Sequence, residues 1–110
     1  MKIEIPLKPI SVNEAFQGRK FKTKKCKQYE KDIVNFLGFW KEKIEGKIEI
    51  HYTFYLINHS RTDYDNLIKI TQDMLVNRGY LVDDSKIYKA IIEKIPSKED
   101  KIIIEIMQYV

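Results

Sequence analysis

The stretch that decides the fold is KIEIHYTFYLI, residues 47–57. Large apolar side chains occupy every second position from Ile48 to Leu56, and mostly polar ones fall between them. Successive side chains of a β-strand point to opposite faces, so this alternation predicts a strand with one buried face. The polar run NHSRT at residues 58–62 then predicts a turn.

A helix is expected on each side of this strand. Thr23 can cap a first helix over residues 24–37, and a second is expected over residues 65–78, with Gly79 in the left-handed position after its last turn. Each helix carries apolar side chains at helical spacing that we expect to face the core. These are Tyr29, Ile33, Phe36, Leu37 and Trp40 in the first helix, and Leu67, Ile70, Met74 and Leu75 in the second.

Three more strands complete the expected fold. Residues 2–8 alternate, residues 10–22 show no period and are expected to form a loop, and residues 86–95 and 101–109 alternate and are rich in isoleucine. The polar residues between the last two strands predict that they form a hairpin. The resulting order β-α-β-α-β-β predicts an α/β fold of the α+β type, with a mixed sheet of about four strands and two helices.

Length and composition narrow the class of protein. A chain of 110 residues, 44% apolar, predicts one domain over residues 1–110, and a domain this small gains stability by dimerising. The formal net charge of +4 weakly favours a polyanionic partner. Cys26 is the single cysteine, and no apolar run resembles a membrane span or the core of a signal peptide. We therefore expect a cytoplasmic protein without membrane contact.

Acidic residues cluster after the central strand. The run RTDYDNLIK, residues 61–69, places Asp63 and Asp65 where the strand gives way to the second helix. Clustered carboxylates suit Mg²⁺, whereas the lack of a cysteine or histidine cluster argues against zinc. Lys69, one helical turn after Asp65, could stabilise negative charge that develops on a phosphoryl group.

The same residues also have ordinary structural explanations. Aspartates near a helix start cap the helix and match its dipole, and Asp65 and Lys69 form an i,i+4 pair. The run Asp83-Asp84 fits a turn. Spacing alone therefore leaves both interpretations open.

A family resemblance favours the metal site. Residues 63–69 resemble the Asp-x-Asp-Asn-Leu-x-Lys signature of the RusA family of Holliday junction resolvases, and residues 79–84, GYLVDD, resemble its Gly-aromatic-x-x-Asp-Asp run. Residues 9–13 are similar to the family's Pro-x-Ser-x-Asn, and residues 94–96 to its Lys-x-Pro. The resemblance spans about residues 9–96, although the N-terminal loop is not closely matched.

The resemblance implies an activity and a set of roles. Members of the family nick four-way DNA junctions symmetrically as Mg²⁺-dependent homodimers, with Mn²⁺ a possible substitute and no organic cofactor. It implies that Asp63, Asp65 and Asp84 are metal-binding catalytic acids and that Lys69 is essential, and it leaves the role of Asp83 open. A nuclease for other branched DNA, such as flaps or forks, and a non-catalytic junction-binding protein are the alternatives.

The separation of the acidic runs suggests how Asp84 reaches the site. A helix over residues 65–78 is about 20 Å long, and the segment from Arg78 to Asp84 spans at most about 20 Å when fully extended. Asp84 can therefore barely rejoin Asp63 and Asp65 of its own chain. Either the helix is shorter, or Asp84 comes from the partner subunit of a homodimer. We favour the second as a hypothesis, because a twofold interface then builds two identical sites.

Basic residues predict where DNA is held. Residues 19–27 contain no acidic residue, and Phe21 lies among them as a side chain that could stack at a branch point. The alternative is a solvated loop with Phe21 packed inside. The residues expected to contact DNA are Asn13, Arg19, Lys20, Lys22, Lys24, Lys25 and Arg61.

Overall fold

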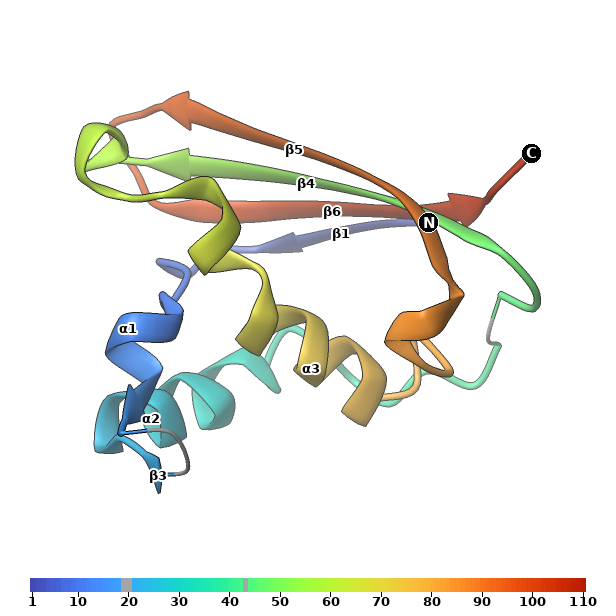
Figure 1. Cartoon of the computed structure of the whole chain (residues 1–110), viewed down its shortest axis with the longest axis horizontal. Helices are drawn as coiled ribbons and strands as arrows, with labels where there is room; N and C mark the ends of the chain where they lie inside the picture. Colours follow the sequence, from blue (N-terminus) through green and yellow to red (C-terminus); the bar gives the residue numbers. More distant parts are fainter. Residues whose placement is uncertain (19–20, 43) are drawn as a thin grey trace.

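The computed structural model describes residues 1–18, 21–42 and 44–110, and it consists of a four-stranded sheet with helices packed on one face (Figure 1). The strands of this sheet are β1 (Lys2–Ile5), β4 (Ile48–Leu56), β5 (Ile87–Pro96) and β6 (Lys101–Gln108). The α-helices are α1 (Val12–Ala15), α2 (Lys24–Ile33) and α3 (Lys69–Asn77). The sheet is mixed, because β5 runs parallel to β4 while β6 runs antiparallel to it. The expected α+β fold is confirmed.

The alternating segment expected to form a strand with one buried face is β4, one of the two inner strands of the sheet. Its five alternating side chains from Ile48 to Leu56 are at most 2% exposed and face the helices. On the neighbouring β6, Ile102, Ile104 and Ile106 are fully buried on the same face. Burying a side chain of this size stabilises the fold by roughly 1.5–3 kcal/mol, so this row of side chains anchors the sheet to the helical layer.

The expected hairpin between the last two strands is wrong. The strand order is β1-β6-β4-β5, so β4 lies between β5 and β6. The short connection after β5 instead wraps around the end of β4. The amide N–H of Ser97 donates to the carbonyl oxygen of Leu56 at 3.0 Å, and the carboxylate of Asp100 accepts from the amide N–H of Ile57 at 2.9 Å. The two inner positions of the sheet are thus taken by β6 and β4, whose inward-facing side chains are buried.

The expected continuous helix over residues 65–78 is also wrong. A 3₁₀ turn, η2 (Tyr64–Leu67), comes first, and α3 begins only at Lys69. The turn closes through the amide N–H of Asn66, which donates to the carbonyl oxygen of Asp63 at 3.2 Å. The predicted apolar stripe is nevertheless buried, and Gly79 adopts the predicted positive φ, +91°.

The first helix begins where predicted and ends early. The Thr23 hydroxyl accepts from the amide N–H of Cys26 at 3.1 Å, which confirms the predicted cap. Because α2 ends at Ile33, the helical spacing no longer holds beyond it. Phe36 is 41% exposed and Trp40 is 38% exposed, so their predicted core positions are wrong, whereas Tyr29, Ile33 and Leu37 are buried as predicted. Within the described ranges no helix is long and apolar enough to cross a membrane.

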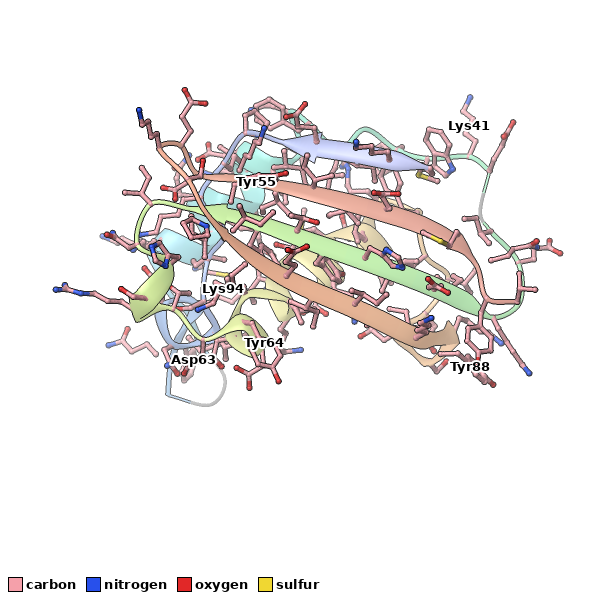
Figure 2. All side chains as sticks on the ribbon, turned by 90° about the horizontal axis from the view of Figure 1, so that it is seen from above. Lys41, Tyr55, Asp63, Tyr64, Tyr88 and Lys94 are labelled. Atoms are coloured by element: carbon pink, nitrogen blue, oxygen red, sulfur yellow. The ribbon has the colours of Figure 1, made fainter. Side chains whose placement is uncertain are left out.

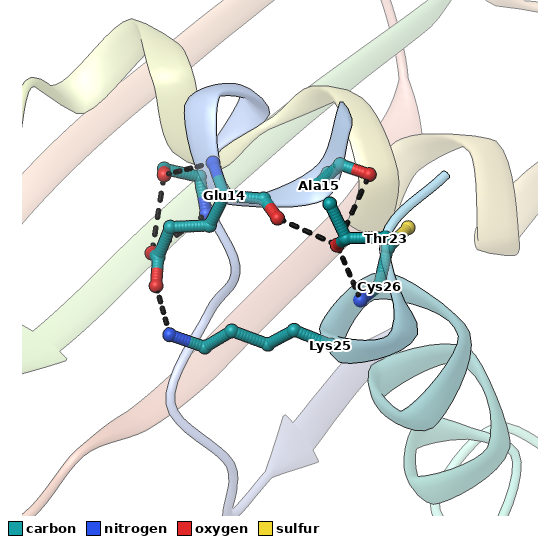
Figure 3. Close-up of polar contacts among 6 residues, drawn as sticks. Glu14, Ala15, Thr23, Lys25 and Cys26 are labelled. Carbon is teal, nitrogen blue, oxygen red and sulfur yellow. Dashed lines mark hydrogen bonds and ion pairs between the residues drawn. The ribbon is translucent and has the colours of Figure 1, made fainter. Parts of the chain in front are cut away.

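The segment expected to be a loop contains a helix and a small hairpin. Ser11 and Glu14 form a capping box at the start of α1, and β2 (Phe16–Gln17) pairs with β3 (Phe21–Lys22). Figure 3 shows how α1 is docked on α2: the Thr23 hydroxyl donates to the carbonyl oxygen of Glu14 at 2.7 Å, and the Lys25 ammonium contacts the Glu14 carboxylate. The Ser-x-x-Glu spacing at residues 11–14 is the sequence signal for this helix.

Candidate active site

The turn that precedes Asp63 is held by a lysine from β5. The ammonium group of Lys94 donates to the backbone carbonyl oxygens of His59 at 2.7 Å and Thr62 at 2.6 Å. Lys94 lies opposite Phe54 in the sheet, so its side chain points to the helix-covered face. A half-buried ammonium needs oxygen partners, and these two carbonyls supply them. The sequence carried a signal for this role: Lys94 is a charged residue at an inward-facing position of a strand, where an apolar residue is usual.

A pocket of about 280 Å³ opens beside this turn. It brings Asn13 from α1 together with Arg61 and Asp63 from the turn after β4, so three predicted site residues from two separate parts of the chain meet there. The other lining residues are Ser11, Glu14, Thr62 and Asn66. A guanidinium and an amide next to a carboxylate form a surface that suits a phosphate with an adjacent cation.

The carboxylates of Asp63 and Asp65 are exposed. Asp63 occupies the position before η2, but its side chain makes no capping hydrogen bond. In the described part of the chain, neither carboxylate has a salt-bridge partner within 4.0 Å. The capping explanation therefore does not apply to Asp63, and both groups present hard oxygen donors of the kind that Mg²⁺ binds.

Lys69 is the first residue of α3 and is exposed. Its ammonium lies 3.4 Å from the carboxylate of Asp73, one turn further along the helix. The ion pair expected from spacing, between Lys69 and Asp65, is not among the salt bridges of the described residues. An exposed i,i+4 pair contributes about 0.3–0.5 kcal/mol, so Asp73 does little to prevent Lys69 from turning towards a phosphate.

Asp84 belongs to a different end of the molecule. It begins the 3₁₀ turn η3 (Asp84–Lys86), which leads into β5, and the Asp83 carboxylate caps that turn by accepting from the amide N–H of Ser85 at 3.5 Å. The start of β5 pairs with the start of β4, whereas Lys94 and the turn that it holds lie at the far end. From Ile87 to Lys94 the strand extends about 23 Å at 3.3 Å per residue.

One chain therefore does not assemble the three predicted metal ligands. In the described residues no group of three or more acidic, histidine or cysteine side chains is arranged to hold a metal ion. The second helix is shorter than expected, since α3 has only nine residues, so its length does not separate Asp84 from Asp63. The separation follows instead from the parallel register of β4 and β5, because Asp63 follows the end of β4 and Asp84 precedes the start of β5.

Asp84 nevertheless lies on the helix-covered side of the sheet. Burial raises the pKa of the Tyr52 hydroxyl, and the negative charge of Asp84 raises it further. Tyr52 points from β4 towards α3, where its hydroxyl donates to the side-chain oxygen of Gln72 at 2.9 Å. Asp63 and Asp84 thus belong to the same layer of the molecule, at different positions along the sheet.

The predicted DNA contacts differ in their surroundings. Arg19 and Lys20 lie outside the described residues. Lys22 pairs with Glu30 at 2.8 Å, and Lys25 pairs with Glu14. The predicted contact that remains on α2, Lys24, is exposed and has no salt bridge to a described residue.

An exposed aromatic side chain accompanies these lysines. Phe21 is 74% exposed on the small hairpin. The alternative in which this ring packs inside the domain is therefore wrong. An exposed ring beside basic residues can stack on an unpaired base.

A comparison with protein-family models agrees with the resemblance found in the sequence. The model of the family described as Endodeoxyribonuclease RusA matches residues 6–107, which is nearly the whole chain. A comparison with curated proteins finds no match. The matched segment includes the pocket beside Asp63, both acidic runs and the basic start of α2. The chain therefore belongs to the RusA family of endodeoxyribonucleases.

Proposed function

We propose that this protein is a Mg²⁺-dependent endonuclease that resolves Holliday junctions by paired symmetric nicks as a homodimer. In each of its two sites, Asp63 and Asp65 come from one subunit and Asp84 from the other. The observation that carries the proposal is the pocket that places Arg61 and Asn13 beside Asp63 in a chain of this nuclease family. A twofold dimer presents two such sites to the two matching strands of a four-way junction.

The donor set supports the choice of metal. All three acids are exposed carboxylates, and the described residues around them include no cysteine or histidine cluster. When bound, Mg²⁺ supplies an activated water and stabilises charge on the phosphate, and Mn²⁺ is a plausible substitute because it also accepts oxygen ligands. Three carboxylates would fill only part of the octahedral coordination that Mg²⁺ prefers, which would leave positions for water and phosphate oxygens.

The remaining residues orient the DNA strand. Arg61 binds a phosphate oxygen through its planar guanidinium, and Asn13, which lines the same pocket, donates to a neighbouring oxygen. Lys69 places its ammonium near the phosphate and stabilises the negative charge that develops there. Lys94 touches no substrate atom and acts by holding the carbonyl groups before Asp63.

Phe21 and Lys24 form the contact with the branch point. The exposed ring of Phe21 stacks on a base at the junction, where pairing is interrupted, and Lys24 binds the adjoining backbone. Flaps and forks also offer unpaired bases next to a duplex, so the same surface would bind them. This makes other branched DNA the second candidate substrate.

A cleavage assay tests the proposal directly. A synthetic four-way junction, a flap, a fork and a linear duplex are incubated with the protein in Mg²⁺, Mn²⁺ or EDTA. We expect paired symmetric nicks in the junction with either metal and no cleavage in EDTA or of the duplex. The Asp63→Asn variant should bind the junction as tightly as the wild type and leave it intact. Junction binding by the wild type without cleavage in either metal would leave the protein as a non-catalytic junction binder.

A further inference from the structure

The outer edge of β5 has unpaired backbone groups. In the described part of the chain, β5 has β4 on one side and no strand on the other. The amide N–H of Ser97 donates to the carbonyl oxygen of Leu56 on β4, and backbone direction alternates along a strand. The odd-numbered residues of β5 therefore bond to β4, and the even-numbered ones, from Tyr88 to Lys94, direct their N–H and C=O groups outward. Such an edge is a template for another strand.

The side chains along this edge have a self-complementary order. Ile91 lies at the middle of β5 and is 44% exposed. Lys89 precedes it by two positions and Glu93 follows it by two, so all three share the sheet face that the helices leave uncovered. Glu93 has no salt-bridge partner among the described residues, and Lys89 has only Glu49, at 3.9 Å. An opposite charge therefore stands on each side of an exposed apolar residue.

We propose that the β5 edge pairs in antiparallel fashion with β5 of a second copy of this chain, about a twofold axis at Ile91. Lys89 of each copy then lies opposite Glu93 of the other, and the two Ile91 side chains face each other. Opposite charges and apolar residues directly across an antiparallel pair stabilise it. A register shifted by two residues in either direction places Ile91 opposite Lys89 or Glu93, which brings a charge against an apolar side chain.

The backbone pattern fits the same register. The outward-facing residues Ala90 and Ile92 lie opposite each other across the axis and exchange both hydrogen bonds. The two Ile91 residues then form a non-hydrogen-bonded pair, whose α-carbons are about 4.5 Å apart. The two sheets join into one continuous sheet, and each copy covers the exposed edge of the other.

This arrangement also completes the composite site, a step that rests on the proposed function. Figure 2 places Asp63 and Lys94 towards one end of β5 and Tyr88 at the other end. A twofold axis at the centre of the strand exchanges those ends. It therefore carries Asp84 of the second copy, which lies just before the start of its β5, to the end where Asp63 lies.

Cysteine cross-linking tests the register without any measurement of activity. In the Ile91→Cys variant the two introduced thiols lie within disulfide range, so mild oxidation should give a covalent dimer. In the Glu93→Cys variant the two thiols lie about 13 Å apart along the strands, and no covalent dimer should form. The wild type, whose single cysteine is buried, is the background control. Equal cross-linking of both variants, or none with Ile91→Cys, would overturn the proposed register.

Charge reversal provides a second test that needs no new thiol. Lys89→Glu and Glu93→Lys each set like charges opposite one another at both pairs, so each alone should dimerise at least about tenfold more weakly than the wild type. A mixture of the two variants restores opposite charges at both pairs. Native mass spectrometry should then find mainly the mixed dimer, and a mixture with no excess of mixed dimer would refute the interface.

These results separate the interface from the activity. Cross-linking at Ile91 together with failure to cut any branched DNA would retain the interface and remove the proposed function. Junction cleavage without cross-linking at Ile91 would retain the function and show that the dimer uses another surface.

Discussion

The ammonium group of Lys94 donates a hydrogen bond of 2.6 Å to the backbone carbonyl oxygen of Thr62. This contact joins the end of β5 to the residue immediately before Asp63, and a second hydrogen bond to His59 anchors the same turn. The Asp63 side chain makes no capping hydrogen bond, so its position depends on the backbone on either side of it. Lys94 holds the preceding residues, and the amide N–H of Asn66 donates to the carbonyl oxygen of Asp63 itself. A strand that carries no predicted catalytic residue thus fixes the placement of a predicted metal ligand.

Replacement of Lys94 by methionine should lower both stability and metal affinity. Methionine retains the apolar part of the side chain and removes both charged hydrogen bonds, and each such bond is worth about 1.5–3 kcal/mol. We expect the free energy of unfolding in urea to fall by at least the value of one such bond, about 1.5–3 kcal/mol. The Mg²⁺ concentration for half-maximal junction cleavage should rise severalfold.

Two further variants separate this positioning role from a general loss of stability. Lys94→Arg retains a cation and should restore part of the metal affinity. Lys98→Met alters an exposed lysine just after β5 and should change neither the free energy of unfolding nor the metal affinity. A folded Lys94→Met protein with an unchanged Mg²⁺ dependence would show that Asp63 is positioned by other contacts.

Lys24 should contribute more to DNA binding than its neighbour Lys25. Lys25 is already paired with Glu14, whereas Lys24 is exposed without a salt bridge to a described residue. Each phosphate contact contributes about 0.9 to the slope of log K against log salt concentration. Lys24→Ala should lower that slope by about one unit, measured by fluorescence anisotropy with a four-way junction. Lys31→Ala, at the other end of α2, is the matched control, and an equal effect of both variants would refute a specific contact at Lys24.

The pair between Glu14 and Lys25 should make stability depend on pH. The hydrogen bond from Lys25 lowers the pKa of Glu14 below its ordinary value of 4.5. A carboxylate whose pKa is lower in the folded state adds stability well above pH 4.5 and loses it as the pH falls through the lowered value. Both side chains are partly exposed, so the contribution is less than about 1 kcal/mol.

Glu14→Gln isolates this contribution, because the amide can maintain the capping box without the charge. The variant should be less stable than the wild type in urea at pH 7, and this difference should shrink as the pH is lowered to 3. Lys24→Gln removes a neighbouring charge that has no described carboxylate partner and should not change stability at either pH. A stability difference for Glu14→Gln that persists unchanged at pH 3 would assign the effect to the cap instead of the ion pair.

Local patterns in the sequence predicted the elements that bury one regular face. The alternation from Ile48 to Leu56 identified β4, and Thr23 marked the start of α2 at the correct residue. Gly79 was correctly placed after α3 because a positive φ is costly for other residues. Each of these features depends on interactions between residues that are close in the sequence, so the sequence alone can predict it.

Features that depend on distant partners could not be predicted in this way. The sequences of β5 and β6 do not reveal that β4 lies between them, because both alternate apolar and polar residues as the two strands of a hairpin would. The exposure of Trp40 follows from the early end of α2, and its ring stacks on Tyr80, with ring centres 5.4 Å apart. The short helix α1 was missed because four residues carry too weak a period, although its Ser-x-x-Glu cap was present.

The candidate site also combines features that local sequence motifs predict with features that depend on distant parts of the chain. The two acidic runs and Arg61 were evident as motifs, and the pocket at Asp63 gives Arg61 and Asn13 a common location. The role of Lys94 depends on carbonyl groups that only the folded chain brings to it. The separation of Asp84 from Asp63 follows from the parallel pairing of β4 and β5, which is a property of topology.

Subunit mixing tests the shared site most directly. Asp63→Asn and Asp84→Asn proteins are prepared separately, shown to be inactive, and then mixed so that subunits exchange. If each site combines Asp63 of one subunit with Asp84 of the other, the mixed dimer holds one intact site, and single nicks should appear in the four-way junction with Mg²⁺. If each subunit built its own site, every site in the mixture would be defective. A mixture that forms mixed dimers and stays inactive would contradict the composite site.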